Sequence, residues 1–457
     1  IVESPSKCKY IETYLSDYNV KCVASCGHFR NIKSLLDIQF LPENTVDVKY
    51  TVDDNSKKQL TFLKKYINLF DKNQIIIATD NDREGEAIGW HICDLFHLPI
   101  ETTKRMIFNE ITEKSLKSSF VSCTTSPIFI NRSLVEAQMA RQVIDFVVGF
   151  KVSPILWKIA SNKKLSAGRC QTPALHLVSE NNKKNEENNM NNMKHKVIGY
   201  FTNEFIPFVN TNEYSDTNIF EYLTNVTRNY SYKFEIKEQN ISAPSPFSTS
   251  KLQQCASNNL KLSPKETMSI CQKLYEKGLI TYMRTDSIKY NSEFIAETHV
   301  FIEQLFGEEY CGKYDNNDTN TNLLAHEAIR VTNLHYVPCE SFPKKETSMY
   351  YLIRDNTIQS LMADAKTNVL CATFSSGNDN KFKYECQQIS FLGWHKLNKI
   401  KTPSTNFNYL KNLKINNVYT IHKIITKPVT HHTAHYTEAK LVSLLEQYGI
   451  GRPSTFA

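Results

Sequence analysis

Tyr282 is the residue whose surroundings best suit covalent chemistry. It lies in the segment Gly278-Leu-Ile-Thr-Tyr-Met-Arg-Thr-Asp-Ser287, where Arg284 follows it by two residues. A phenol with a pKa near 10 is a weak nucleophile at neutral pH, so it needs a proton acceptor, cationic partners or a metal-organised site to attack a phosphate. A tyrosine packed on a buried strand is the ordinary alternative for any single tyrosine. The other motifs of the chain favour the nucleophile.

A cluster of acids lies far upstream of this tyrosine. The segment Asp80-Asn-Asp82-Arg-Glu84-Gly-Glu86 has a carboxylate at every second position. If its backbone is extended, the first three acids point the same way and can share one Mg²⁺, partly through water. A calcium loop begins similarly, but its twelfth position requires a bidentate glutamate and is His91 here. A solvated acidic turn is the remaining alternative.

The N-terminal segment Glu3-Ser-Pro-Ser-Lys7 adds an acid and a cation. It closes a first strand, so Glu3 is expected beside the acidic cluster if that strand neighbours the strand at 74–79. A carboxyl crowded by other acids has a raised pKa and can donate a proton near neutrality. Lys7 offers a compact positive charge that suits a phosphate.

Three further motifs combine cations with hydrogen-bonding groups. Ser166-Ala-Gly-Arg-Cys-Gln-Thr172 and Gly449-Ile-Gly-Arg-Pro-Ser-Thr455 are loops of a kind that holds phosphates, although one copy alone is weak evidence. Ala325-His-Glu-Ala-Ile-Arg330 places His326 and Arg330 on one face of a predicted helix, and it lacks the second histidine of a zinc motif. The sequence contains no Gly-x-x-x-x-Gly-Lys-Ser/Thr loop, so an energy-neutral phosphoryl exchange fits better than nucleotide hydrolysis.

The pattern of apolar residues predicts an α/β unit over the first 125 residues. Gln74–Thr79 is typical of a strand buried on both faces, and the residues from Gly85 to Leu95 indicate the helix that follows. The acids stand at strand ends, where open α/β sheets form their binding sites. Beyond this unit we expect helices over 131–180, a solvated insertion over 181–196, and a β domain interrupted by an inserted helical block.

The inserted block has a clear helix start. Ser263-Pro264-Lys265-Glu266 supplies a capping serine, a proline at the first helical position and a glutamate at the third. Gly278 can end this helix in the left-handed region. With a preceding helix near 251–259, the pattern predicts a helix-turn-helix that leads into Tyr282. Such a unit can read a DNA major groove or serve only as a packing unit.

The composition of the chain limits its domain number, its partners and its cellular compartment. The chain has 457 residues, which predicts three or four domains. A net charge of +7 permits a nucleic-acid partner without demonstrating one. Twelve scattered cysteines with no Cys-x-x-Cys pair indicate reduced thiols in an intracellular protein without a zinc site. No apolar run is long enough to span a bilayer. Ile1-Val2-Glu3 reads as the end of a buried strand, so we expect no signal peptide and a few missing upstream residues.

Taken in order along the chain, these motifs resemble the type IA DNA topoisomerases, and within them bacterial DNA topoisomerase I more than topoisomerase III. The motifs that carry the resemblance are Glu3–Lys7, Gly27-His28, Ala78–Glu86, Phe108–Thr112, Ser166–Thr172, Ile280–Ser287, His326–Arg330 and Gly449–Thr455. The resemblance implies a multidomain α/β and α+β torus around a hole for DNA. Its domains would be a Rossmann-like Toprim domain at 1–125, a helical gate-base domain at 126–180 and 431–457, a β-rich arch at 181–245 and 367–430, and a helical domain at 246–366 that carries Tyr282.

The resemblance also implies a mechanism. Tyr282 would attack single-stranded DNA and become linked to the 5′ phosphate, the other strand would pass, and religation would relax negatively supercoiled DNA without ATP. Glu3 would protonate the leaving 3′ oxygen, Lys7 and Arg284 would stabilise charge on the phosphate, and Asp80, Asp82 and Glu84 would hold Mg²⁺. We expect a monomer that acts wherever the genomic DNA is, in a prokaryotic cytoplasm or a viral replication compartment. The residues implied to line the single-strand path are His28, Arg141, Asp145, Arg169, Gln171, Thr172, His326, Arg330, Arg452, Ser454 and Thr455.

Some features depart from the family pattern. Val331 stands where the family usually has proline, and Cys170-Gln-Thr172 mixes the two subfamilies. The chain stops at Ala457, within the gate-base domain, so we expect it to cleave single strands but to relax supercoils poorly. Two alternatives stay open: a Toprim-type nuclease or primase that needs no tyrosine, and a non-enzymatic single-strand DNA-binding protein.

Overall fold

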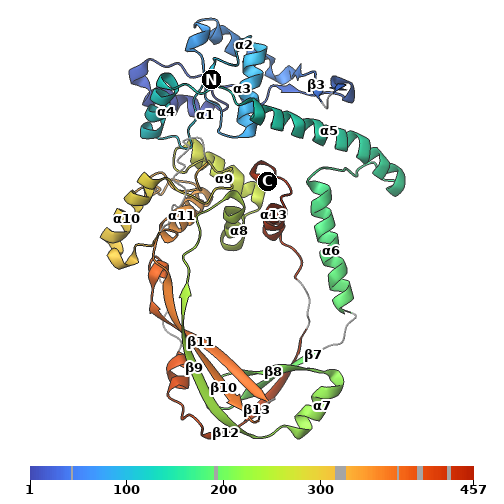
Figure 1. The fold of residues 1–457 in the computed structure, drawn as a ribbon, viewed down its shortest axis with the longest axis vertical. Coiled ribbons are helices and arrows are strands. Elements are labelled where there is room, and N and C mark those ends of the chain that lie inside the picture. Colours follow the sequence, from blue (N-terminus) through green and yellow to red (C-terminus); the bar gives the residue numbers. More distant parts are fainter. Residues whose placement is uncertain are drawn as a thin grey trace.

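The elements of the chain are arranged in a ring, as the computed structural model in Figure 1 shows. The structure describes residues 1–42, 45–189, 194–313, 326–377, 380–398, 405–429 and 434–456. The N-terminal α/β unit and a block of helices lie at one end of the ring, and a β-sheet lies at the other. Strands that rise from the sheet form one side, and the helix α6 runs along the opposite side. In the described residues, no helix is long and apolar enough to cross a membrane.

The N-terminal unit is built on short parallel pairings. Strands β5 and β6 pair in parallel, and Val2 forms a parallel bridge with Ala24. The amide of Ala78 donates to the carbonyl of Ile1 over 2.7 Å, so the first segment of the chain lies beside β5, as the sequence predicted. The elements of this unit are α1 (Pro5–Tyr14), β1 (Arg30–Asn31), β2 (Ile38–Phe40), β3 (Val46–Val48), β4 (Thr51–Val52), α2 (Lys57–Ile67), β5 (Ile76–Ile77), α3 (Arg83–Leu95), β6 (Lys104–Arg105) and α4 (Glu113–Thr125).

A fully buried arginine fixes the ends of these strands. Arg105 donates from Nε to Glu86 Oε2 and from Nη2 to the carbonyl oxygen of Asp80, each over 2.8 Å. The other carboxylate oxygen of Glu86 accepts from the amide of Asn131 over 2.7 Å. A buried charge is tolerated only when it is paired and hydrogen-bonded, which holds for both partners here. The backbone at Asp80 is therefore held from inside the unit.

Two long helices follow, α5 (Arg132–Ala160) and α6 (Gln171–Asn189). The segment 181–196, predicted to be a solvated insertion, is exposed at four of the six residues 181–186 but belongs to a regular helix there. Helix α6 continues to Asn189, and β7 begins at Lys194. Asn181 is buried, and its Nδ2 donates to the carbonyl of Ala434 over 3.3 Å. The lack of apolar residues thus indicated the exposure of most of these side chains but not the helix, and only Asn181 and Asn185 are buried among residues 181–186. Residues 190–193 of the predicted insertion lie outside the described residues.

The inserted helical block consists of α8 (Thr249–Leu260), α9 (Pro264–Glu276), α10 (Ser292–Phe306) and α11 (Lys344–Gln359). The predicted start of α9 is confirmed, because Ser263 and Glu266 form a capping box and Pro264 is the first helical residue. Gly278 has φ +70°, as predicted, and a Cβ there would lie 2.3 Å from the carbonyl oxygen of Ile111. Only glycine fits both the backbone and the close approach. This turn delivers the chain to Tyr282 against the N-terminal unit.

The sheet at the far end is antiparallel and has seven strands in the order β12-β9-β10-β11-β8-β7-β13. Strands from before and after the helical block pair directly, since β9 and β10 pair along eleven residues. A cluster of buried aromatic residues, including Phe201, Phe374 and Tyr232, fills its core. The elements are β7 (Lys194–Tyr200), β8 (Phe208–Ser215), α7 (Asp216–Asn225), β9 (Asn229–Ile241), β10 (Ala365–Ser375), β11 (Lys381–Phe391), α12 (Thr405–Lys411), β12 (Val418–Thr420) and β13 (Lys423–Val429).

The ring closes where α13 (Glu438–Gln447) packs against α8. Ser250 Oγ on α8 donates to the carboxylate of Glu446 on α13. On the other side of the helical block, a single hydrophobic core runs from the N-terminal unit into α8, α9 and α11, with Ile111, Tyr275 and Tyr282 among its residues. The helical block is thus held on one face by a shared apolar core and on another by α13.

Candidate active site

Tyr282 lies at the junction between the helical block and the N-terminal unit. Its side chain is only 3% exposed, and its hydroxyl donates to the carboxylate of Asp82. Its backbone amide donates to the carbonyl of Asn109 over 2.7 Å. Burial and the neighbouring charge of Asp82 raise the pKa of Tyr282 well above 10. The phenol is therefore protonated at rest, and a carboxylate already stands where its proton can go.

The sequence analysis placed the acids at 80–84 on one extended segment, but the structure does not. Helix α3 begins at Arg83, and Asp82 caps it by accepting from the amide of Gly85 over 2.8 Å. Glu84 therefore lies in the first turn of the helix rather than on an extended strand. The helix starts here because Asp82 is a favoured N-cap residue and the acids after it suit a helix N-terminus. Asp82 and Glu84 still meet at one place, because Arg284 contacts both.

Glu3 stands beside the acids, as predicted. Its Oε1 accepts from the amide of Asp80 over 3.0 Å. The pKa of Glu3 is raised to about 8, first by burial and then by the charge of Asp80, while Lys7 opposes the rise. The sequence predicted a raised pKa from crowding by other acids, but burial is the larger cause. Glu3 is mostly protonated at neutral pH and can act as a proton donor.

Lys7 is fully buried and forms an ion pair with Asp80. Its Nζ also lies 5.1 Å from the centre of the Tyr275 ring, a cation–π distance. The lysine is thus held inside the site rather than displayed on its surface. Its charge offsets that of Asp80, which reduces the repulsion that an incoming phosphate would meet.

Arg284 joins the two remaining acids. Its Nη1 lies 2.9 Å from Glu84 Oε2 and 3.5 Å from Asp82 Oδ2. His28 approaches Glu84 from another side, with Nε2 3.3 Å from Oε1. The hydrogen bond from His28 and the charges of Arg284 and Arg141 lower the pKa of Glu84 to about 2, against the effect of burial. Glu84 is therefore a carboxylate at every physiological pH.

The site has the donor chemistry of a magnesium site. Asp80, Asp82 and Glu84 provide hard carboxylate oxygens, and Mg²⁺ is usually bound through one or two carboxylates with several waters. These three acids face two protein cations, Lys7 and Arg284, so one negative charge remains when Glu3 is protonated. Among the described residues, however, no group of three acidic, histidine or cysteine side chains converges on one point. In this arrangement the guanidinium of Arg284 lies where a cation would contact Asp82 and Glu84 together.

The remaining expected residues lie on two loops that are neighbours in space, since a Cβ on Gly451 would lie 3.5 Å from Cys170 Sγ. Arg169, on the loop before α6, donates from Nε to Asp145 Oδ1 over 3.0 Å, and Arg141 approaches the same carboxylate at 3.7 Å. Thr172 Oγ1 accepts from the amide of Gly168 over 3.2 Å, and Gln171 begins α6. Near the end of the chain, Thr455 Oγ1 accepts from the amide of the exposed Arg452 over 2.8 Å. The side chain of Ser454 lies outside the part that the structure describes.

The segment around His326 is not the helix that the sequence predicted. Ile329 bridges Phe247, and Val331 bridges Ile280, so the backbone is extended and pairs with neighbouring segments. This tertiary pairing overrides the local helix preference. The ring of His326 stacks on that of Tyr282, with centroids 5.9 Å apart and planes at 23°.

Arg330 is placed in the interior rather than along an open path. Its side chain is 4% exposed, and Nη1 lies 3.1 Å from Glu110 and Nε 2.8 Å from Glu327. The guanidinium also covers the ring of Phe294 at 4.0 Å. In this arrangement Arg330 joins the helical block to the N-terminal unit, and it is not displayed for DNA.

The sequence analysis assigned no role to several residues that position the side chains of the site. Asn109 positions the backbone of Tyr282, and Glu110 receives Arg330, although both stood in the quoted motif Phe108–Thr112. That motif was the signal that could have indicated them. Tyr275 and Arg105 gave no such signal, because each lies in an ordinary helix or strand pattern and gains its role only from long-range packing.

Comparisons with known proteins identify the family. Residues 129–457 match the family model described as DNA topoisomerase, and residues 1–111 match the Toprim domain. The chain belongs to the type IA DNA topoisomerases. Full-length topoisomerase I from Thermotoga maritima is a similar solved structure, with 29% sequence identity and a TM-score of 0.82 over 100% of this chain and 76% of that chain. The expected fold class and enzyme class, a type I topoisomerase close to bacterial topoisomerase I, are confirmed.

Proposed function

We propose that this type IA topoisomerase cleaves single-stranded DNA through a 5′-phosphotyrosine at Tyr282, passes a strand and religates the break, and thereby relaxes negatively supercoiled DNA without ATP. The observation that carries the proposal is the hydrogen bond from the Tyr282 hydroxyl to Asp82, in a site that also holds a protonated acid and two cations. A nucleophile, an acceptor for its proton and a donor for the leaving group meet there.

The bonds and protons balance within the site. The phenolic oxygen of Tyr282 attacks phosphorus while its proton moves to Asp82. The bond between phosphorus and the 3′ oxygen breaks, and Glu3 gives its proton to that oxygen. Lys7 and Arg284 offset the charge on the phosphate, a kind of electrostatic stabilisation that is worth about 3 to 4 kcal/mol per group in comparable sites. Religation is the reverse, so the energy of the phosphodiester is kept in the phosphotyrosine and no nucleotide is needed.

Magnesium would be held by Asp80, Asp82 and Glu84. When bound, it supplies positive charge beside the phosphate and favours closing of the break. For its part, Arg284 must leave the position between Asp82 and Glu84, where it lies at 3.5 and 2.9 Å from them. We infer that Arg284 then turns to the phosphate.

The single strand is proposed to follow the residues expected from the resemblance. His28, Arg141, Asp145, Arg169, Gln171 and Thr172 lie between the acidic site and the start of α6, and Arg452 and Thr455 lie near α13. His326 stacks on Tyr282 and can guide a base or phosphate beside it. Arg330 contributes only if the helical block separates from the N-terminal unit, because its guanidinium is paired inside.

Strand passage requires the ring to open. We propose that the helical block at 246–366 moves away from the Toprim domain at 1–125 and from the gate base at 126–180 and 431–457, while the arch at 181–245 and 367–430 carries it. The contact between α8 and α13, with its Ser250–Glu446 hydrogen bond, is one interface that must part. The protein is proposed to act as a monomer wherever genomic DNA is held.

The test uses a single-stranded oligonucleotide labelled at its 3′ end, incubated with the protein and Mg²⁺ and then denatured. Label should remain covalently bound to the wild-type protein and not to a Tyr282→Phe variant, because that change removes only the attacking oxygen. A matched Tyr448→Phe change, on an exposed tyrosine after α13, should leave the adduct unchanged. Cut but unbound label would favour a Toprim-type nuclease, and salt-sensitive binding without cutting would favour a single-strand DNA-binding protein.

A further inference from the structure

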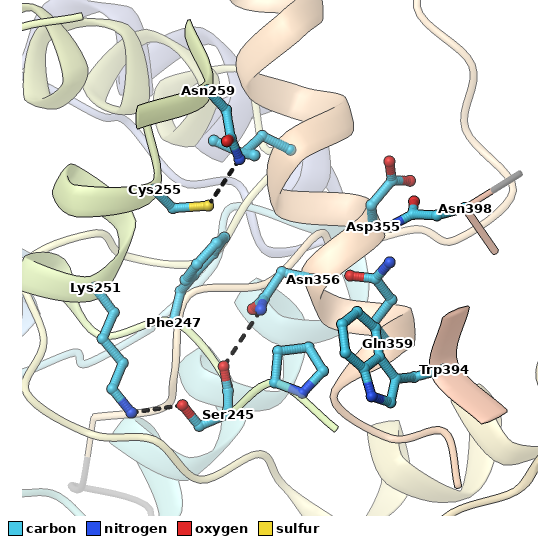
Figure 2. Close-up of a pocket in the computed structure, with 12 residues that line it drawn as sticks. Ser245, Phe247, Lys251, Cys255, Asn259, Asp355, Asn356, Gln359, Trp394 and Asn398 are labelled. Carbon is cyan, nitrogen blue, oxygen red and sulfur yellow. Dashed lines mark hydrogen bonds between the residues drawn. The ribbon is translucent and has the colours of Figure 1, made fainter. Parts of the chain in front are cut away.

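A cavity lies away from the tyrosine, where the arch strands enter the helical block. Its volume is about 440 Å³, within the range of small-molecule sites. Four segments meet there: the link from β9 to α8, α8 itself, α11 and the turn after β11. The indole Nε1 of Trp394, in that turn, donates to the carbonyl of Ile241 at the end of β9 over 3.1 Å. The cavity is thus built from both sides of the junction (Figure 2).

Two buried amides in this cavity have unused hydrogen-bonding atoms. Asn356 is 7% exposed and Gln359 is 8% exposed, and they lie three residues apart on α11. Among the described residues, Asn356 Oδ1 and Gln359 Nε2 have no partner. Asn356 Nδ2 donates to the carbonyl of Ser245 over 3.3 Å, which fixes the amide and leaves its oxygen as an acceptor. A buried polar atom without a partner destabilises the structure around it, so these atoms favour a ligand that satisfies them.

The walls of the cavity suit a flat ring. Phe247, Leu352, Pro244 and Trp394 line it, and Figure 2 shows the Phe247 and Trp394 rings on either side of Asn356. A ligand that satisfies both groups needs one donor toward the amide oxygen of Asn356 and one acceptor toward the amide nitrogen of Gln359. A nucleobase offers this combination on its edge, with flat faces for the aromatic walls.

We propose that this cavity is a binding site for a nucleobase, with the base edge on Asn356 and Gln359 and its faces against Phe247 and Trp394. The base can come from a free nucleoside or nucleotide, or from an unpaired base of bound DNA. The site is separate from the tyrosine and uses none of the residues of the cleavage chemistry.

The first experiment is calorimetric titration of the full chain with thymidine. Wild type should bind it, and Gln359→Glu should bind at least about tenfold more weakly, because this nearly isosteric change replaces the N–H donor with a carboxylate that repels a base carbonyl. Gln387→Glu makes the same chemical change at an exposed position on β11 and should bind as wild type does. N3-methylthymidine, whose ring donor is blocked, should also bind at least about tenfold more weakly to wild type.

A second measurement needs no variant. Cys255 lines the cavity on α8 and accepts from Asn259 Nδ2 at 3.3 Å, whereas Cys339 is exposed elsewhere. Thymidine should slow alkylation of Cys255 and leave that of Cys339 unchanged. If a saturating single-stranded oligonucleotide protects Cys255 in the same way, the base comes from DNA; if only the nucleoside protects, the ligand is free. Equal binding by wild type and Gln359→Glu, or no protection of Cys255 at about 10 mM thymidine, would overturn the proposal.

Discussion

The pH dependence of DNA cleavage should report the protonation of Glu3. The pKa of Glu3 is raised to about 8 by burial and by Asp80. A group with this pKa is about 91% protonated at pH 7 and about 9% protonated at pH 9, so a step that needs its proton slows about tenfold over that interval. An ordinary glutamate would be under about 1% protonated at pH 7 and would give little catalysis at either pH. Burial therefore places the proton donor in the working range.

The path taken by the proton of Tyr282 determines how the cleavage rate varies with pH below pH 8. If Asp82 takes the proton from Tyr282, no proton is exchanged with solvent before cleavage, and the rate is level below pH 8 and falls above it. If hydroxide takes the proton instead, the rate rises with pH up to 8 and is level above it, because the two ionisations then offset each other. The hydrogen bond between Tyr282 and Asp82 predicts the first profile.

The assay is single-turnover cleavage of a 3′-labelled oligonucleotide between pH 6.5 and 9.5, in the presence of a chelator so that added metal does not shift the pKa of Glu3. A Glu3→Gln variant should cleave at least about a hundredfold more slowly, since an amide cannot donate the proton, and its rate should not fall above pH 8. The reasoning is refuted if the wild-type rate rises through pH 8, or if Glu3→Gln keeps the wild-type rate and profile.

Three further changes test the architecture of the site. Gly85→Ala places a Cβ 2.2 Å from the backbone oxygen of Asp80, so cleavage should fall at least about a hundredfold. Circular dichroism should show that the fold is retained. Gly149→Ala is the control, because its Cβ meets nothing within 4 Å, and it should leave cleavage unchanged. Arg284→Ala should tighten Mg²⁺ binding in calorimetry while slowing cleavage, because the competing guanidinium is removed; weaker Mg²⁺ binding would contradict this. Arg105→Met should lower the free energy of unfolding by about 3 to 5 kcal/mol in denaturant titrations, because it leaves Glu86 buried and unpaired; a change below about 1 kcal/mol would speak against that role.

Local signals in the sequence were enough to predict several elements. The capping box at Ser263 and Glu266 and the left-handed Gly278 appear as predicted, because caps and glycine turns depend on residues close together in the chain. The approach of Glu3 to Asp80 also follows from a simple rule, that neighbouring parallel strands end at the same edge of a sheet.

Other features could not be predicted because distant segments decide them. The segment around His326 is extended since it forms single bridges with Phe247 and Ile280, which the local pattern does not reveal. The burial that raises the pKa of Glu3 and the placement of Arg330 against Glu110 depend on how the helical block packs on the N-terminal unit. The orphan amides of Asn356 and Gln359 likewise have no sequence signature.

The sheet at the far end of the ring has a mechanical consequence. Both sides of the ring attach to the same sheet, one through β9 and β10 and the other through β7 and β13. Because β9 has 13 residues, it forms a lever about 40 Å long. A change of about 10° in twist across the sheet would move the far end of that lever by about 7 Å. A sheet whose strands are hydrogen-bonded across its width stores such a change elastically, as a leaf spring does. In the ring opening proposed above, a sheet that returns to its resting twist would also bring the two sides of the ring back together.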